Sequence, residues 1–376
     1  VALRSPGVYL ASLERRGYVI ADFETRRECI RLGVTAAAEA EGGQAVVEPA
    51  VLAEVTALVE WPVPIAGHFD ARYLELPPEV LVATLQDHQR YFPVKAPDGK
   101  LMPLFIAVAN VQSRDPQQVR AGNERVVRPR LADAAFFYET DRKTPLASRQ
   151  PALAKVTFQA RLGTLADKTA RITELAGQIA RATGEEPEAA QRAAQLAKCD
   201  LVTAMVGEFP ELQGLMGRYY ALHGGESDTV AAALGEQYLP RFAGDALPAT
   251  GAGLALAIAD KLDTIVGIFA IGQKPTGAKD PFGLRRAALG LVRIIIEQEL
   301  DFDLDDLLAF AIKAQPTGTT DHRELPESVR EFIVERLRAW YLERPGFGAE
   351  MFEAVRSKRP ASLLDFDLRL KAVAAF

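Results

Sequence analysis

The spacing of apolar positions changes along the chain, and the first part mixes two periods. Apolar residues recur at helical spacing over 26–40 and 48–60, which predicts two amphipathic helices. Two short apolar runs, 79–84 and 104–111, are bounded by proline and by Asp98-Gly99, which is typical of buried strands joined through a hairpin tip. The pattern therefore predicts an α+β domain over residues 1–155.

The pattern becomes helical almost throughout after residue 155. Each predicted helix is bounded by a capping residue, a glycine or a proline. The expected helices are Thr164–Ala182, Pro187–Gly207, Pro210–His223, one capped by Ser227 or Asp228, and one opened by Asp280 and Pro281 that runs to about Glu299. We expect a mostly α-helical domain over 156–300, followed by a helical extension or linker region over 301–376.

Composition places the chain among ordinary globular proteins. With 376 residues, 48% hydrophobic and 25% charged, it is long enough for two or three domains. The net charge of −6 argues against extensive coating by nucleic acid but allows a local basic stripe. Cys29 and Cys199 are too few for a disulfide framework, so we expect the cytoplasm. No apolar run suits a membrane span, and Val1 inside a patterned segment suggests a piece of a longer protein.

A glycine-rich segment suggests phosphate binding at first sight. Gly272 and Gly277 have the spacing of a nucleotide-binding loop, but Ala278 intervenes before the lysine and Asp280 stands where that loop needs a hydroxyl. We therefore predict a basic patch at a helix start, favourable for phosphate, instead of a nucleotide loop. The patch comprises Lys274, Lys279, Arg285 and Arg286. A capped interhelix loop with solvated charges is the alternative.

A second cationic cluster precedes the predicted helix 131–138. Arg125, Arg128 and Arg130 supply three guanidinium groups that suit phosphate oxygens. The alternative is a set of salt bridges to neighbouring carboxylates at 124, 133 and 139. Elsewhere, His88 could act in acid–base chemistry, but no nucleophile or partner accompanies it. We expect His88 to be a structural residue in a turn, and we predict no catalytic residue in this chain.

Four blocks, in order along the chain, resemble the β subunit of the bacterial two-subunit glycyl-tRNA synthetase. The resemblance is clearest between Leu76 and Arg293. The longest block begins Asp200-Leu-Val-Thr-Ala-Met-Val-Gly-Glu-Phe-Pro-Glu-Leu-Gln-Gly214. The others are 86–93, 122–133, and 259–264 continuing into 272–281.

The resemblance implies a division of labour between subunits. In that family the α subunit carries the class II catalytic site for glycine and ATP, and the β subunit supplies tRNA recognition and the rest of an α2β2 enzyme. We therefore expect a non-catalytic part of a glycine–tRNA ligase with two partners, the α subunit and the tRNA for glycine. ATP and magnesium are expected at the α subunit and no cofactor here. The first domain is expected to be B3/4-like, and anticodon contacts are expected outside this chain.

The resemblance also implies an HD-like helical domain. Active HD proteins hold a divalent ion with a His, a His-Asp pair and a later Asp. Cys199 and Asp200 stand at the position of the pair and Asp260 at that of the final Asp, but no His lies near Asp167. We therefore expect no metal, with Cys199 on a packing stripe. The alternatives are a metal-dependent phosphohydrolase of the HD type and a purely structural scaffold.

Overall fold

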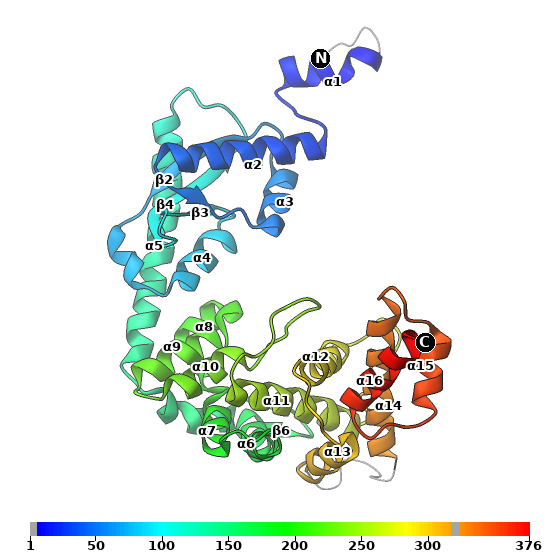
Figure 1. Ribbon diagram of the computed structural model, residues 1–376. Helices are drawn as coiled ribbons and strands as arrows, with labels where there is room; N and C mark the ends of the chain where they lie inside the picture. The colour runs from blue at the N-terminus through cyan, green and yellow to red at the C-terminus, as the bar shows by residue number, and fades with distance from the viewer. Residues whose placement is uncertain (1–5, 317–323) are drawn as a thin grey trace. The chain divides into compact units, whose positions relative to one another are not determined.

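The chain folds into two units, Val1–Asp141 and Arg142–Phe376, each with its own core (Figure 1). This computed structural model describes residues 6–316 and 324–376. In the described part no helix combines the length and the apolar character that crossing a membrane requires. The division predicted from the sequence, with borders near residues 155 and 300, stays a prediction.

The first unit is α+β. Its helices are α1 (Tyr9–Ser12), α2 (Phe23–Ala40), α3 (Pro49–Leu58), α4 (Pro78–Gln86) and most of α5 (Pro116–Arg142), and its strands are β1 (Gln44–Ala45), β2 (Val63–His68), β3 (Phe92–Lys95) and β4 (Leu101–Ala109). The four strands form one antiparallel sheet in the order β1-β3-β4-β2. The two helices expected near the start are confirmed as α2 and α3.

Helix α2 covers one face of this sheet. Ile30, Val34 and Ala38 recur every four residues, so they form one stripe along the helix, and all three are completely buried. The stripe packs with Phe92 and Ile106 in a single apolar cluster. This packing fixes the sheet in the core of the unit.

The prediction of a strand over residues 79–84 is wrong. This segment lies in helix α4, where Pro78 takes a position in the first turn that proline suits. Val80, Leu81, Thr84 and Leu85 are buried at helical spacing, and the β-branched residues hid this period in so short a run. The hairpin tip at Asp98-Gly99 is correct, but it joins β4 to β3.

Helix α5 begins fifteen residues before the helix that the sequence predicts from Leu131. It runs through Pro129, which lies inside the helix. Since proline has no N–H, the carbonyl of Arg125 loses its usual helical donor, yet the chain remains helical. Arg125 and Arg128 consequently lie within a helix and not before its first turn, so no helix N-terminus assists them.

The second unit is almost entirely helical. Its helices are α6 (Leu165–Ala182), α7 (Pro187–Leu196), α8 (Ala204–Glu208), α9 (Leu215–His223), α10 (Asp228–Glu236), α11 (Gly251–Ala270), α12 (Leu284–Glu297), α13 (Leu304–Lys313), α14 (Leu325–Leu342), α15 (Ala349–Arg356) and α16 (Leu363–Ala374). Two short strands, β5 (Thr157–Gln159) and β6 (Gly163–Thr164), precede α6. Helix α6 with its Thr164 cap and α10 with its Ser227 cap confirm the sequence prediction.

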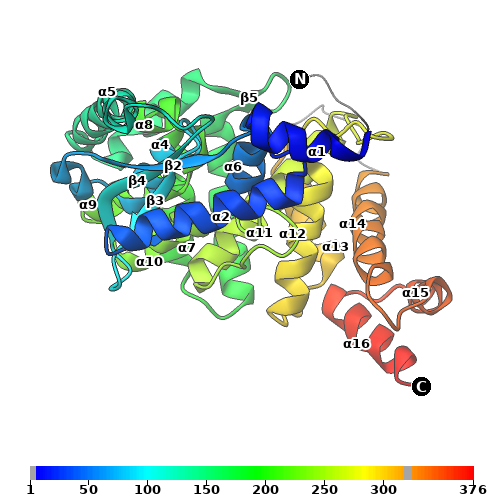
Figure 2. The ribbon, with the colours of Figure 1, turned by 90° about the horizontal axis from the view of Figure 1, so that it is seen from above.

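Helix α11 is the centre of this unit. All of its 20 residues are buried except Gly251, Asp260 and Thr264, which are partly exposed. It packs against α6, α7, α10, α12, α13 and α14, which explains why its sequence is apolar all round. Helices α14 and α16 pack against α12, and Figure 2 shows α15 and α16 at the C-terminal end.

Three predicted helices of this unit have different bounds. The helix expected over 210–223 begins at Leu215, after a separate 3-10 turn at Pro210–Leu212. The helix expected over 187–207 is interrupted by a 3-10 turn at Cys199–Val202, so Cys199 does not share one helical stripe with Val206. Helix α12 begins at Leu284 instead of Asp280. Asp280 still caps it, because its carboxylate accepts hydrogen bonds from the backbone N–H groups of Leu284 and Arg285 at 2.9 Å.

Candidate functional site

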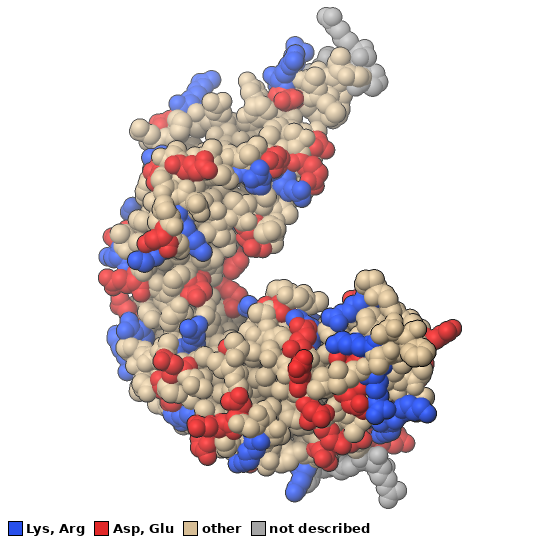
Figure 3. All heavy atoms as spheres, in the orientation of Figure 1, with Lys and Arg blue, Asp and Glu red and all other residues tan. Residues whose placement is uncertain are grey.

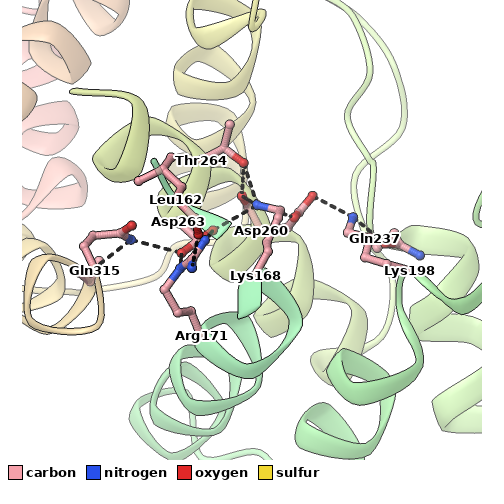
Figure 4. Close-up of polar contacts among 10 residues, drawn as sticks. Leu162, Lys168, Arg171, Lys198, Gln237, Asp260, Asp263, Thr264 and Gln315 are labelled. Atoms are coloured by element: carbon pink, nitrogen blue, oxygen red, sulfur yellow. Dashed lines mark hydrogen bonds and ion pairs between the residues drawn. The ribbon is translucent and has the colours of Figure 1, made fainter. Parts of the chain in front are cut away.

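The polar residues of α11 lie together near its middle and face neighbouring helices. Asp263 and Thr264 follow Asp260 by three and four residues, so all three lie on adjoining faces of the helix. Helix α6 presents Lys168 and Arg171 toward them at the same kind of spacing (Figure 4). These side chains form a buried charge centre, and we use this name below for Lys168, Arg171, Lys198, Asp260 and Asp263.

The ammonium group of Lys168 lies among oxygen atoms of α11. Its Nζ is 3.0 Å from Asp260 Oδ1 and 3.0 Å from Asp263 Oδ2, and it donates a hydrogen bond to Thr264 Oγ1 at 2.8 Å. The backbone carbonyl of Asp260 is a further acceptor at 3.4 Å. The ring of Phe158 lies 4.7 Å from Nζ, a distance at which a cation is attracted to an aromatic face.

Asp263 is held by a second cation and an amide. Arg171 Nε donates to Asp263 Oδ1 at 2.6 Å, and its Nη1 donates to the Leu162 carbonyl at 3.0 Å. Gln315 Nε2, just beyond α13, donates to the same carboxylate at 3.0 Å. Burial alone raises the pKa of Asp263, but the nearby Lys168 and Arg171 outweigh it and hold the pKa below its usual value.

Lys198 approaches Asp260 from the opposite side. Its ammonium lies 3.1 Å from Asp260 Oδ2, donates to Gln237 Oε1 at 2.8 Å, and sits 4.3 Å from the ring centre of Tyr238. Burial raises the pKa of Asp260, but attraction to Lys168 and Lys198 reverses the shift and keeps the pKa well below its usual value. Asp260 is therefore a carboxylate with one ammonium group at each oxygen.

Lys261 points away from this arrangement. Its Nζ donates to the backbone carbonyl of Leu239 at 2.6 Å, and the side chain is almost completely buried. Burial lowers the pKa of this lysine to about 8, because the charged form has lost most of its hydration.

Asp200 fixes the turn that leads into α9. The backbone N–H of Gly214 donates to Asp200 Oδ2, and a Cβ on Gly217 would lie 3.3 Å from the same oxygen. Both glycines of the segment Gly214-Leu-Met-Gly217 are therefore needed for the close approach of the helix start to the carboxylate. Burial raises the pKa of Asp200 to about 6.

Cys199 is buried, and its thiol is unreactive near neutral pH. Burial raises the pKa of its thiol to about 12, so the thiolate that would bind a metal or attack a substrate is not formed near neutral pH. Its Sγ lies 3.9 Å from the Gln195 carbonyl. The thiol thus packs in the core, although not in the continuous helix that the sequence predicts.

These residues do not form a metal-ligand set. In residues 6–316 and 324–376 no three His, Cys, Asp or Glu side chains come together in a way that suits a metal ion. Asp260 and Asp200, two positions of the expected HD arrangement, have separate roles, one in the ion pairs and the other at the start of α9.

The first predicted phosphate site lies on α5. Arg125 and Arg128 are exposed, and neither has a hydrogen bond or ion pair to any residue in the described part of the chain. Glu124, a predicted partner, instead accepts a hydrogen bond from the backbone N–H of His68 at 2.9 Å. Arg130 is also exposed, but it already has a contact within the chain, so it is less available to bind phosphate.

Two side chains of the second predicted phosphate site, Lys274 and Arg285, donate hydrogen bonds within the chain. Lys274 Nζ donates to Ser328 Oγ at 2.5 Å, and Arg285 donates to the Gly277 carbonyl at 2.6 Å. Lys279 and Arg286 are exposed. Figure 3 shows basic and acidic side chains mixed over the visible face, so phosphate contacts here would be local.

His88 lies in the turn between α4 and β3, partly buried and with a contact of its own. Its neighbours in the block 86–93 have structural contacts. Arg90 Nε is 2.6 Å from Glu54, and Tyr91 stacks on Phe105 with ring centres 4.8 Å apart. The block therefore joins α4 to the sheet.

Comparison with known proteins gives a family. The family model described as "Glycyl-tRNA synthetase beta subunit" matches residues 1–357. This chain belongs to the glycyl-tRNA synthetase beta subunit family. A relative from Pseudomonas putida (strain W619) named glycine–tRNA ligase beta subunit is 53% identical over 376 residues, which is 100% of this chain and 55% of the relative.

Two other relatives in the glycyl-tRNA synthetase beta subunit family carry the same name. One from Ectopseudomonas mendocina (strain ymp) is 54% identical over 376 residues, covering 100% of this chain and 54% of the relative. One from Marinobacter nauticus is 52% identical over 373 residues, covering 99% and 53%. The chain thus spans about half the length of these relatives.

For this member of the beta subunit family, the sequence missed most of the buried charge centre. Lys168, Arg171, Lys198 and Asp263 were not among the predicted site residues, although Asp260 was. The available signal was Asp263, a third charged residue inside an otherwise apolar helix, because a buried charged residue needs a partner. Lys168 gave a weaker signal, since a lysine on an amphipathic helix usually faces solvent.

Proposed function

We propose that this chain is the part of a two-subunit glycine–tRNA ligase that binds the tRNA for glycine and assembles with a catalytic partner subunit. Membership of the beta subunit family supports the assignment to this ligase. The name of the relatives, a beta subunit, supports an assembly with another kind of subunit, which we take to be α2β2. Glycine activation, with ATP and magnesium, is assigned to that partner.

The observation that carries tRNA binding is the availability of Arg125 and Arg128. Two other exposed arginines of the same unit are held by carboxylates, Arg27 by Glu24 at 2.5 Å and Arg31 by Glu28 at 2.6 Å, whereas Arg15, Arg16, Arg114 and Arg120 have no such partner among the described residues. The guanidinium groups of Arg125 and Arg128 keep all their donors free within the described residues. A free guanidinium is well suited to phosphate because its fork of N–H groups matches two phosphate oxygens.

The spacing of the pair supports contacts along one strand of RNA. Residues three apart on a helix are neighbours on one face and are displaced by about 4.5 Å along the axis. Two guanidinium groups at this separation can bind one phosphate or two successive ones. Lys279 and Arg286 of the second unit form a smaller candidate pair, and Lys274 and Arg285 contribute less because of their internal bonds.

The buried charge centre does not favour a phosphohydrolase. Activation of water at an HD-type centre needs a metal held by several open ligands. Both oxygens of Asp260 face ammonium groups instead. An HD-like ancestry of the helical unit is a proposal that rests on the order of Cys199, Asp200 and Asp260 alone.

The test uses the two-subunit enzyme assembled from full-length subunits. The double variant Arg125→Ala with Arg128→Ala is expected to bind the tRNA at least about tenfold more weakly, with ATP–pyrophosphate exchange nearly unchanged. Arg27→Ala with Arg31→Ala is the matched control, with the same change of charge in the same unit. Lost exchange with unchanged tRNA affinity would contradict the assignment of roles. Unchanged affinity with intact assembly would favour a structural scaffold.

A further inference from the structure

The ammonium group of Lys168 is surrounded as a bound cation would be. Four oxygen atoms lie within 3.4 Å of Nζ: a carboxylate oxygen each from Asp260 and Asp263, the hydroxyl of Thr264 and the backbone carbonyl of Asp260. The ring of Phe158 covers a further side of the ammonium group, with its centre 4.7 Å from Nζ. Only 4% of the Lys168 side chain is exposed, although Asp260 and Thr264 are partly exposed, so the oxygens form a cage in which the ammonium group is largely shielded from bulk water.

The size of the cage suits an ammonium group better than a small divalent ion. The distances from Nζ to the four oxygens, 2.8 to 3.4 Å, are longer than the roughly 2.0–2.6 Å at which oxygen ligands bind magnesium or calcium. Lys198 and Arg171 also remain beside the two carboxylates when Lys168 is absent. They repel a second positive charge, so the cage favours a single charge over a double one.

The two lysines lie next to the positions that hold the metal ion in active HD proteins. Lys168 follows Asp167, near which the first histidine of an HD set was sought, and Lys198 precedes Cys199, which stands for the second. Both ammonium groups converge on Asp260, the final position of that set. Cations attached to the chain thus lie beside positions that correspond to metal ligands in active HD proteins.

We propose that this cage is a cation site whose cation is the lysine side chain itself, so that the helical unit folds without a metal. Removing the side chain beyond Cβ opens the cage to a free primary alkylammonium ion. The n-propylammonium ion has the same three carbons and ammonium group that Lys168→Ala removes. This inference concerns folding and is independent of the proposed tRNA site.

The test is chemical rescue of the Lys168→Ala variant of the 376-residue chain. The variant is expected to melt at least about 5 °C below the wild type, because a buried carboxylate pair has lost a cation. In n-propylammonium chloride its melting temperature is expected to rise toward the wild-type value with a saturable dependence on concentration. Tetramethylammonium chloride at equal concentration, which has no N–H donors, is expected to give no such rise.

Two controls separate occupation of the cage from general effects of salt. The wild type is expected to respond equally to both salts, because its cage is filled. Lys168→Met fills the space of the side chain without the charge, so it is expected to be destabilised but not rescued. Equal responses of Lys168→Ala to both salts, or equal rescue of Lys168→Met, would overturn the proposal.

If Lys168→Ala does not fold without an added cation, a refolding measurement tests the proposal instead. Lys168→Ala unfolded in urea is diluted into either salt, and the folded fraction is followed by near-ultraviolet circular dichroism. A larger folded fraction in n-propylammonium than in tetramethylammonium supports the cage. Equal fractions, including none in either salt, contradict it, as does a stoichiometric metal in the wild type whose removal unfolds the chain.

Discussion

Lys198 donates a hydrogen bond to Asp260 Oδ2 across 3.1 Å and thereby joins the segment after α7 to the middle of α11. Only 4% of the lysine side chain and 13% of the aspartate side chain are exposed. At this depth water cannot replace the lost partner of either charge. The pair is therefore expected to behave as one energetic unit.

A double-mutant cycle tests this coupling. Lys198→Met and Asp260→Asn are each expected to lower the free energy of unfolding by about 3 kcal/mol, because each leaves a buried group without its partner. The double variant is expected to lose about 1–3 kcal/mol less than the sum of the single losses. Urea unfolding monitored by circular dichroism gives all four values. Additive losses would show that the two charges do not interact.

The dependence of stability on pH should show the titration of the Asp200 carboxyl group. Its pKa is raised by burial from 3.8 to about 6, and its Oδ1 has no hydrogen-bond partner in the part of the chain that the structure describes. A raised pKa means that the folded chain binds the proton more tightly than the unfolded chain. The stabilisation from this proton is complete below about pH 4 and is lost as the pH rises through about 6.

Asp200→Asn removes this titration but keeps an acceptor for the Gly214 N–H. Relative to the wild type, the variant is expected to gain about 3 kcal/mol of stability between pH 4 and pH 7. Asp245→Asn is the control with the opposite sign. Burial raises the pKa of Asp245, but hydrogen bonds from Arg241 and Ala246 outweigh it and lower the pKa. A pH-independent difference between Asp200→Asn and the wild type would contradict the raised pKa.

Gly214 is predicted to resist substitution. Its φ is +80°, and a Cβ there would lie 3.1 Å from the backbone oxygen of Leu234. Gly214→Ala is expected to lower the free energy of unfolding by about 1–3 kcal/mol through backbone strain. Gly122→Ala, at an exposed position inside α5 with nothing within 4 Å of the new Cβ, should stabilise by up to about 1 kcal/mol. Thermal unfolding compares the two, and equal effects would contradict this account.

The sequence predicted helices with long apolar stripes best. The period of α2 and the capped start of α6 are strong local signals, and both helices formed where they were expected. Helix α4 was mistaken for a strand because its run is short and rich in apolar residues, so helical and strand periods cannot be told apart. Helix α5 was predicted too short, from Leu131 only, whereas it runs through Pro129, a residue type that usually ends a helix.

The buried charge centre depends on contacts that no local pattern encodes. Lys168 and Asp260 are 92 residues apart, and their pairing follows only from the packing of α6 on α11. The resemblance directed attention to Asp260 as a degenerate metal position. It gave no indication that lysines from two other segments would take both of its oxygens.

The most direct test of the central claim is titration of this chain with the tRNA for glycine at several salt concentrations. Phosphate contacts release counterions, so each lost contact weakens binding and reduces the slope of log affinity against log salt by roughly 0.7–0.9. Arg125→Ala with Arg128→Ala is expected to weaken binding at least about tenfold and to flatten this slope, whereas Arg27→Ala with Arg31→Ala leaves both nearly unchanged. Unchanged affinity and slope in the folded Arg125/Arg128 variant would contradict the claim that these arginines bind tRNA.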